Sequence, residues 1–369
     1  MGWHAGCSVI IVVNHQAYAV SVGKECLARA LLAEPSNLGG AARDTHDESL
    51  ELLRFRPAVV AEHVLVTTDG SEPANRSVPM AVNAIRACGS PRVTLFRVLT
   101  CMEGARAPVH ALEWELARAQ ADADLRQVAA RFNGLHDRVE TVMAVGRPAE
   151  QILNYVHSNK VDLLVMASHG SHDSRTWRMG SVARKVVAEI RTSVFITPPE
   201  ADVSKLERVL LPLDCSARAE CVLPLVAKLA DVHDPEFVLA HVVPRLEIPH
   251  RLPAGGRDRE LVDELTGRNR CRAEAYLQGV RDRLTRRGVR TKVELLSDVN
   301  PARAIERLAN NSDVDLILMS AHGASCHEGE SYGSFARRML DSLVKPLWIV
   351  QDLPSSRPHS HQHSSGVRS

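Results

Sequence analysis

The sequence contains the same pattern twice. An apolar run over residues 63–71 ends in Asp-x-Ser, and a similar run with the same ending spans residues 208–216. Further along, the segment 161–170, which begins Val-Asp-Leu and ends His-Gly, returns as 314–323, and the Gly-Ser pair at 180–181 returns at 333–334. Because self-similarity over most of a chain marks a duplicated structural unit, we expect two tandem domains of one fold.

The spacing of the repeat shows where the copies differ in length. The offset between copies is 145 residues at the Asp-x-Ser motif and 153 at the later motifs, so eight extra residues enter the second copy between them. Residues 244–259, rich in Pro, Gly and Arg, are predicted to hold this insertion as a loop. The expected organisation is an unassigned extension over 1–61, domains over 62–199 and 205–352, and a disordered tail rich in His and Ser over 353–369.

Each copy alternates short apolar runs with longer segments of helical period, which is typical of βαβ units on a parallel sheet. The runs show little polar alternation, as expected when helices cover both faces of the sheet. We therefore predict an α/β fold with two doubly wound parallel sheets, whose halves pack side by side through their last strands. The predicted strands are 63–68, 93–99, 138–145, 162–168 and 194–197, then 207–213, 236–243, 290–297, 315–320 and 347–350; the helices of the first copy are 72–88, 109–132, 149–158 and 181–190.

Composition gives weaker information. Lys and Arg number 45 against 44 Asp and Glu, so net charge favours neither nucleic acid nor an anionic membrane as a partner. Eight cysteines without a C-x-x-C pair indicate a reducing compartment. The apolar stretch 7–23 is interrupted by polar residues and has no basic flank, which argues against a membrane span or a secretory signal. We expect a soluble, cytoplasmic protein.

The repeated motifs fall at the carboxyl ends of the predicted strands, where doubly wound sheets bind ligands. Asp69 suits hydrogen bonds from ribose hydroxyls or an exocyclic amine; equally, it suits an Asx turn before the first helix, beside Ser71 as its N-cap. Gly170 is expected to let the chain turn without blocking a ligand. Gly180 and Ser181 open the last helix, whose free N–H groups favour a phosphate, although an ordinary Gly-Ser helix start has the same sequence.

This arrangement resembles the universal stress protein family over residues 62–352, through the Asp-ended first strand and the G-x2-G-x9-G-(S/T) loop of the ATP-binding branch. The resemblance implies Rossmann-like domains of the adenine nucleotide alpha hydrolase type, with ATP as ligand, either alone or with Mg²⁺. It implies that Asp69 faces ribose or adenine, that Val98 presents backbone to the base, and that the remaining residues surround sugar and phosphates. These are Met166, Ala167, His169, Gly170, Gly180, Ser181 and Val182, and in the second copy Asp214, Val242, Met319, Ser320, His322, Gly323, Gly333, Ser334 and Phe335.

Two departures from the family pattern affect the expected sites. The first glycine of the loop is Ala167 in one copy and Ser320 in the other, which would narrow the pocket. Loop one carries Arg175 and Arg178 beside Asp173, whereas loop two carries Glu328 and Glu330 without a Lys or Arg over 324–332. We therefore expect the first copy to be the better ATP site, and the second to be degenerate or to take a less charged adenosine compound; alternatively, these loop charges are simply solvated.

No motif for catalysis is recognisable. The sequence has no G-x4-G-K-[ST], no G-x-G-x-x-G after a strand and no G-x-S-x-G. His169 and His322 are expected to shape their loops, and His359, His361 and His363 to belong to the disordered tail, the alternative being a metal chelator.

The resemblance implies a stress-response regulator that is not an enzyme, with at most slow ATP hydrolysis. It is expected to dimerise beyond its internal pair of domains and to bind protein partners, but neither nucleic acid nor membrane. One alternative is a non-nucleotide scaffold of the same family. Another is an adenylyl transferase, which would need H-x-G-H or Ser-Gly-Gly near the first strand, and neither is present.

Overall fold

The computed structural model describes residues 8–13, 16–21, 61–89, 91–100, 111–132, 138–170, 179–199, 201, 206–245, 256–324 and 330–352. The chain divides into two compact units, 1–57 and 58–369. In the first unit, β1 (Ser8–Val13) pairs antiparallel with β2 (Gln16–Ser21) as a hairpin. None of the helices within the described part of the chain is long and apolar enough to cross a membrane.

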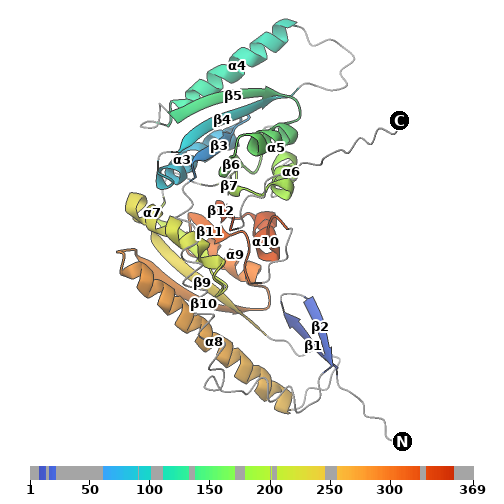
Figure 1. The fold of residues 1–369 in the computed structure, drawn as a ribbon, viewed down its shortest axis with the longest axis vertical. Helices are drawn as coiled ribbons and strands as arrows, with labels where there is room; N and C mark the ends of the chain where they lie inside the picture. The colour runs from blue at the N-terminus through green and yellow to red at the C-terminus, as the bar shows by residue number, and fades with distance from the viewer. Residues whose placement is uncertain are drawn as a thin grey trace, which may run out of the picture. The chain divides into compact units, whose positions relative to one another are not determined.

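The second unit is built on one ten-stranded sheet with the order β10-β9-β8-β11-β12-β7-β6-β3-β4-β5 (Figure 1). Its first half contains β3 (His63–Thr67), α3 (Glu72–Ala87), β4 (Arg92–Leu99), α4 (Ala111–Ala129), β5 (Val139–Val145), α5 (Pro148–Ser158), β6 (Leu163–Ala167), α6 (Ser181–Glu189) and β7 (Ser193–Thr197). The second half contains β8 (Arg208–Pro212), the short 3-10 helix η3 (Ala219–Val222), α7 (Leu223–His233), β9 (Glu236–Pro244), α8 (Gly256–Thr285), β10 (Thr291–Asp298), α9 (Pro301–Asn311), β11 (Leu316–Ser320), α10 (Ser334–Ser342) and β12 (Leu347–Val350).

Both halves are doubly wound parallel sheets, which confirms the predicted fold class. In the first half β3 lies between β4 and β6, and all of its pairings are parallel; β8 lies in the same way between β9 and β11. Two apolar cores cover the sheet. One contains residues of α3, α4, α7 and α8, and the other contains residues of α5, α6, α9 and α10. Helices therefore cover both faces, as the continuous apolar strands require.

The Asp of the repeated Val-Asp-Leu motif fastens neighbouring strands together. Asp162 Oδ2 accepts hydrogen bonds from the backbone N–H groups of Glu62 and His63, at 2.9 and 3.0 Å. Asp315 Oδ2 does the same for Glu207 and Arg208, at 2.7 and 2.8 Å. In both halves one carboxylate thus satisfies two donors at the start of the first strand, which fixes where β3 and β8 begin.

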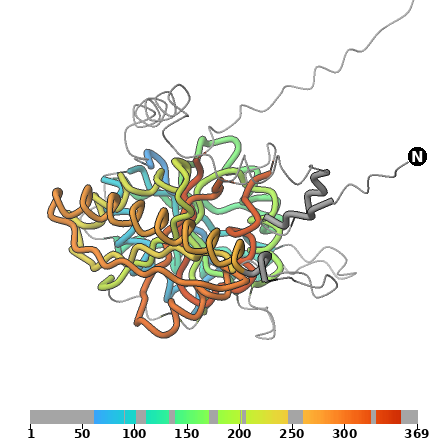
Figure 2. The backbone as a smooth tube through the Cα atoms, turned by 90° about the horizontal axis from the view of Figure 1, so that it is seen from below, coloured from blue at the N-terminus to red at the C-terminus, as the bar shows by residue number. Residues whose placement is uncertain are grey.

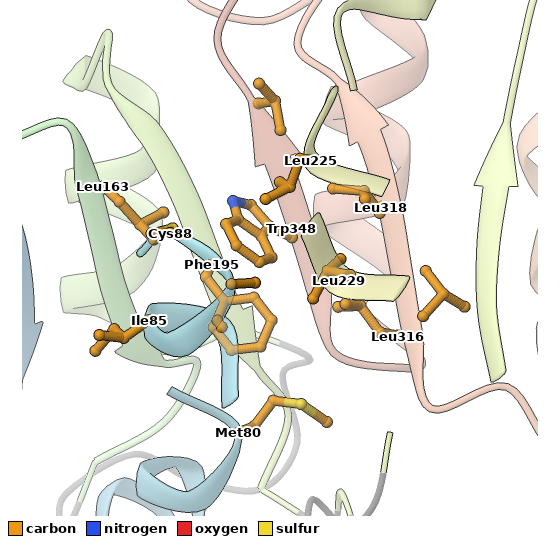
Figure 3. Packing of buried hydrophobic residues seen from close by; sticks show 14 of the residues in the cluster. Met80, Ile85, Cys88, Leu163, Phe195, Leu225, Leu229, Leu316, Leu318 and Trp348 are labelled. Atoms are coloured by element: carbon orange, nitrogen blue, oxygen red, sulfur yellow. The ribbon is translucent and has the colours of Figure 1, made fainter. Parts of the chain in front are cut away.

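The two halves join through their last strands, which confirms the predicted pairing. β12 pairs antiparallel with β7, and Trp348 lies directly opposite Phe195 in the register. Their ring centroids are 5.7 Å apart, within a core shared by strands and helices of both halves (Figure 3). Gln351 N also donates to Ser193 Oγ at 3.0 Å. Because buried side chains and backbone bonds cross the junction, the halves form one continuous sheet.

The predicted insertion loop over 244–259 is wrong at its end, because α8 already begins at Gly256. α8 has 30 residues against 19 in α4, so the second copy carries a longer helix. Ion pairs one turn apart, Glu264 with Arg268 and Arg270 with Glu274, support this charged helix. The loop was predicted from Gly, Pro and Arg content alone, which does not take the spacing of these charged pairs into account. Residues 246–255 of the predicted loop lie outside the described residues.

Candidate functional site

The candidate site of the first half lies where β3 and β6 end, between strands whose connections leave in opposite directions. Asp69 is exposed just after β3, and its Oδ1 accepts a hydrogen bond from Ser71 N at 2.9 Å. Ser71 is the N-cap of α3, accepting from Ala74 N at 3.4 Å. The Asx turn and the cap expected from the sequence are both present, and they leave Asp69 at the exposed edge of the sheet.

Gly170 lies directly against Asp69. A Cβ atom added to Gly170 would stand 2.5 Å from Asp69 Oδ2, closer than atoms approach without a shift. The φ angle of Gly170 is not in the left-handed region. The sequence-based reason for this glycine, freedom to turn, is therefore wrong. A side chain at residue 170 would instead force the exposed Asp69 carboxylate to shift.

The loop that follows β6 returns to the start of α6. Gly180 N donates to Ser168 O at 2.8 Å, and Gly180 caps α6 in an extended conformation without a side-chain hydrogen bond. The N–H groups of the first helical turn, which includes Ser181 and Val182, have no partners inside the helix. The first turn also contains no acidic residue. This helix end suits an anion.

The remaining predicted residues line the same edge in different ways. The last ladder pair of β3 and β4 is Thr67 with Phe96, so Val98 is level with Asp69, two residues further along each strand. Met166 is 4% exposed and belongs to the core, whereas Ala167 is half-buried. Met166 therefore packs in the apolar core behind the site.

His169 is buried beside Ser168, whose Oγ lies 2.9 Å from His169 Nδ1. That contact agrees with a histidine that shapes the loop. Arg175, Arg178 and Asp173, on which the predicted charge of loop one depends, lie outside the described residues.

The second half repeats this geometry around Asp214. Asp214 Oδ1 accepts from Ser216 N at 3.0 Å and from Ser216 Oγ at 2.5 Å, and Oδ2 accepts from Ala324 N at 2.7 Å. A Cβ atom on Gly323 would overlap Asp214 Oδ2. Gly333 caps α10 with the same backbone angles as Gly180. Val242 and Met319 are buried, and Ser334 and Phe335 open α10.

His322 is buried in the second half and is held by contacts at both ring nitrogens. Its side chain has no exposed surface; Nδ1 lies 2.7 Å from Asp352 Oδ1, and Nε2 lies 3.0 Å from the carbonyl oxygen of Glu330. Each ring nitrogen therefore lies within hydrogen-bond distance of an oxygen atom. Asp352 also lies 3.7 Å from Arg218. Sequence reasoning missed Asp352 because its pairing joins residues 30 positions apart.

The predicted negative charge of loop two is partly neutralised. The Glu330 carboxylate lies 3.1 Å from Arg337, a residue of α10. Ser320 Oγ donates to the carbonyl oxygen of His322 at 2.6 Å, so the hydroxyl that replaces the first glycine of the loop is used inside the loop. Glu328 lies outside the described residues.

The residues next to Asp69 and Asp214 differ between the two halves. In the first half, the Arg97–Asp124 ion pair (2.5 Å) lies over Gly70, whose φ is +80°. In the second half, Cys215 follows Asp214 with φ 65°, and its Sγ lies 3.7 Å from His241 Nδ1.

Burial and the Asp214 charge raise the pKa of Cys215 to about 11. This residue is therefore a neutral thiol near pH 7, and its nucleophilicity is low because the thiolate is the reactive form.

Comparisons with known proteins show which family this chain resembles. The universal stress protein family model matches residues 61–198 and 205–351. A universal stress protein of Methanocaldococcus jannaschii is 25% identical over 154 residues, covering 39% of this chain and 94% of that protein. A universal stress protein of Thermus aquaticus is 30% identical over 135 residues, covering 36% of this chain and 96% of that protein.

A solved structure shares the fold over both halves. The crystal structure of a universal stress protein from Archaeoglobus fulgidus covers 79% of this chain and 99% of its own, with 18% identity and a TM-score of 0.56.

Proposed function

The chain belongs to the universal stress protein family, and from this premise we propose that its first domain binds an adenine nucleotide, with ATP as the preferred ligand. The observation that carries the proposal is the pairing of two features at one edge of the sheet. The exposed Asp69 carboxylate ends β3, and the α6 N-terminus, capped by Gly180 without a side chain, opens beyond β6. A nucleoside polyphosphate needs an acceptor for its sugar or base and donors for its phosphates.

Each predicted residue has a defined task in this proposal. Asp69 accepts from ribose hydroxyls or the adenine amine, and the backbone at Val98 faces the base. Gly170 and His169 border the sugar, and the N–H groups of Ser181 and Val182 hold phosphate oxygens. Among the residues that the structure describes, no group of three His, Cys, Asp or Glu could hold a metal ion. Mg²⁺ would accordingly be bound mainly by phosphate oxygens of the ligand.

The second domain is proposed to bind ATP more weakly. Loop two carries Glu328 and Glu330 and no Lys or Arg over residues 324–332, whereas loop one carries Arg175 and Arg178 beside Asp173. Carboxylates near the phosphate seat repel a polyphosphate, and guanidinium groups attract it. We propose that the whole chain acts as a cytoplasmic stress-response regulator rather than an enzyme, in which the nucleotide controls contacts with partner proteins or with a second copy.

The test is calorimetric titration of nucleotide-free protein with ATP and Mg²⁺. Gly180→Glu places a carboxylate at the proposed phosphate seat of the first domain, and Gly333→Glu is the matched change in the second. We expect about one equivalent per chain for the wild type, loss of that binding in Gly180→Glu, and retention in Gly333→Glu.

Circular dichroism checks that both variants remain folded. Wild-type protein that takes up no ATP, or a Gly180→Glu variant that binds as well as the wild type, would contradict the proposal. The first outcome favours a non-nucleotide scaffold of the same family, for which the internally bonded Ser320 and Asp214 already provide support.

A further inference from the structure

The outer edge of β10 borders a hollow that the nucleotide site does not use. β10 ends the ten-stranded sheet and pairs on one side with β9. Among the described residues, no strand pairs with its other side. α8 runs beside it (Figures 1 and 2). The two elements line a hollow of about 670 Å³, formed on α8 by Cys271, Glu274, Ala275, Gln278 and Arg281, and on β10 by Thr291, Lys292, Val293 and Leu295.

Within the described part of the chain, the outer edge of β10 carries backbone donors and acceptors that pair with no neighbouring strand. The carbonyl oxygens of Arg290 and Asp298 accept from β9 and from the residue that follows it. Because backbone groups alternate in direction along a strand, the even-numbered positions face β9 and the odd-numbered positions face outward. Val293 and Leu295 therefore present N–H and C=O groups to the open side. Their half-buried apolar side chains lie on the α8 face and form the floor of the hollow.

The two walls have matching lengths. The eleven residues of α8 from Cys271 to Arg281 span about 15 Å. The β10 wall, from Thr291 to Leu295, spans about 13 Å. We call this hollow between α8 and the open edge of β10 the slot. Its length fits an extended segment of about five residues, which could add to the sheet as a further strand.

One end of the slot is basic. α8 and β10 meet at the turn where Thr285 Oγ1 lies 3.5 Å from Thr291 Oγ1, which places Arg281 and Lys292 at the same end. The exposed Arg286 and Arg287 follow in the turn. The carboxylates at this end are Asp282, 3.3 Å from Arg281, and Glu294, 2.7 Å from Lys292. Lys292 and Glu294 belong to the other face of β10, where Glu236 also lies near Lys292. On the α8 side, Arg281, Arg286 and Arg287 outnumber Asp282, and this excess of cations favours an acidic residue on a partner.

We propose that this slot is a docking site for an extended peptide segment of a partner protein, which adds to the sheet as a strand beside β10. The segment carries apolar residues at alternate positions, which pack on Ala275, Val293 and Leu295. An acidic residue at one end faces Arg281. Main-chain hydrogen bonds to β10 hold the segment, and the floor and the basic end select it.

The test pans a phage-displayed heptapeptide library against the full chain and measures selected, fluorescein-labelled peptides by anisotropy. Val293→Pro removes an outward N–H without removing a bond to β9. Thr141→Pro, at the equivalent position of the opposite edge strand β5, controls for the general cost of an edge proline. Ala275→Phe fills the slot from its α8 side. Because Ala275 is exposed, this substitution should leave the fold intact. Arg281→Glu reverses the basic end.

We expect peptides with alternating apolar residues and an acidic end. Their affinity should fall at least tenfold in Val293→Pro, Ala275→Phe and Arg281→Glu and stay unchanged in Thr141→Pro. Failure to enrich peptides over an Ala275→Phe control, or equal binding to Val293→Pro and the wild type, overturns the proposal. A concentration-dependent dimer that Val293→Pro abolishes, without peptide enrichment, also overturns it and assigns the edge to a second copy.

Discussion

Gly170 and Gly323 each lie against the aspartate that ends the first strand of their half. The repeat marked both glycines as important, but their role depends on a contact between residues about 100 positions apart, Asp69 with Gly170 and Asp214 with Gly323. Local sequence contains no signal for such an approach. At the residue scale, the sequence therefore singled out both glycines but did not reveal the contact with aspartate that a side chain would disturb.

Gly170→Ala should destabilise the protein by about 0.5–1.5 kcal/mol, because the new Cβ displaces the Asp69 carboxylate and weakens its hydrogen bond with Ser71 N. Asp69→Ala removes that clash, so the double variant should be less destabilised than the sum of the single variants. Urea denaturation of the four proteins measures the coupling. Gly279→Ala in α8 is the control, since no atom lies within 4 Å of its added Cβ, and it should stabilise by about 0.5–1 kcal/mol. Strict additivity would contradict the proposed clash.

The strands could be predicted because they are buried on both faces. β3 and β6 are nearly continuous runs of Val, Leu and Met, and their burial leaves little choice of structure. The predicted bounds differ from the observed ones by a residue or two. The start of α8 was harder to predict. Its first turns lie in a stretch whose Gly and Pro residues suggested a loop, whereas charged pairs further along support a helix.

Removing the carboxylate that fastens β3 or β8 should weaken the sheet. Asp162→Ala leaves the N–H groups of Glu62 and His63 without their acceptor, and Asp315→Ala does the same to Glu207 and Arg208. Each should cost about 1–3 kcal/mol in the free energy of unfolding. Asp122→Ala is the matched control, because its exposed ion pair with Arg126 contributes at most about 0.5 kcal/mol. If the three variants unfolded alike in urea, the fastening role would be wrong.

At the scale of the whole second unit, one apolar core contains residues of both halves. The halves should therefore unfold together, in a single transition followed by far-ultraviolet circular dichroism. Trp348→Ala should cost about 3–5 kcal/mol and shift that transition, because it empties the junction with β7. Two separate transitions in the wild type would show that the junction does not couple the halves.

The junction also shows what covalent linkage permits. The later motifs of the two copies are 153 residues apart, and so are Phe195 and Trp348, which face each other across β7 and β12. A pair of identical chains joined in this way would place the same residue on both sides of its two-fold axis. Here one chain carries both halves, so that symmetry is not imposed, and Phe195 meets Trp348 at the junction. The same freedom lets the surroundings of the two sites differ: the Arg97–Asp124 pair lies over Gly70 in the first half, and Cys215 lies beside His241 in the second.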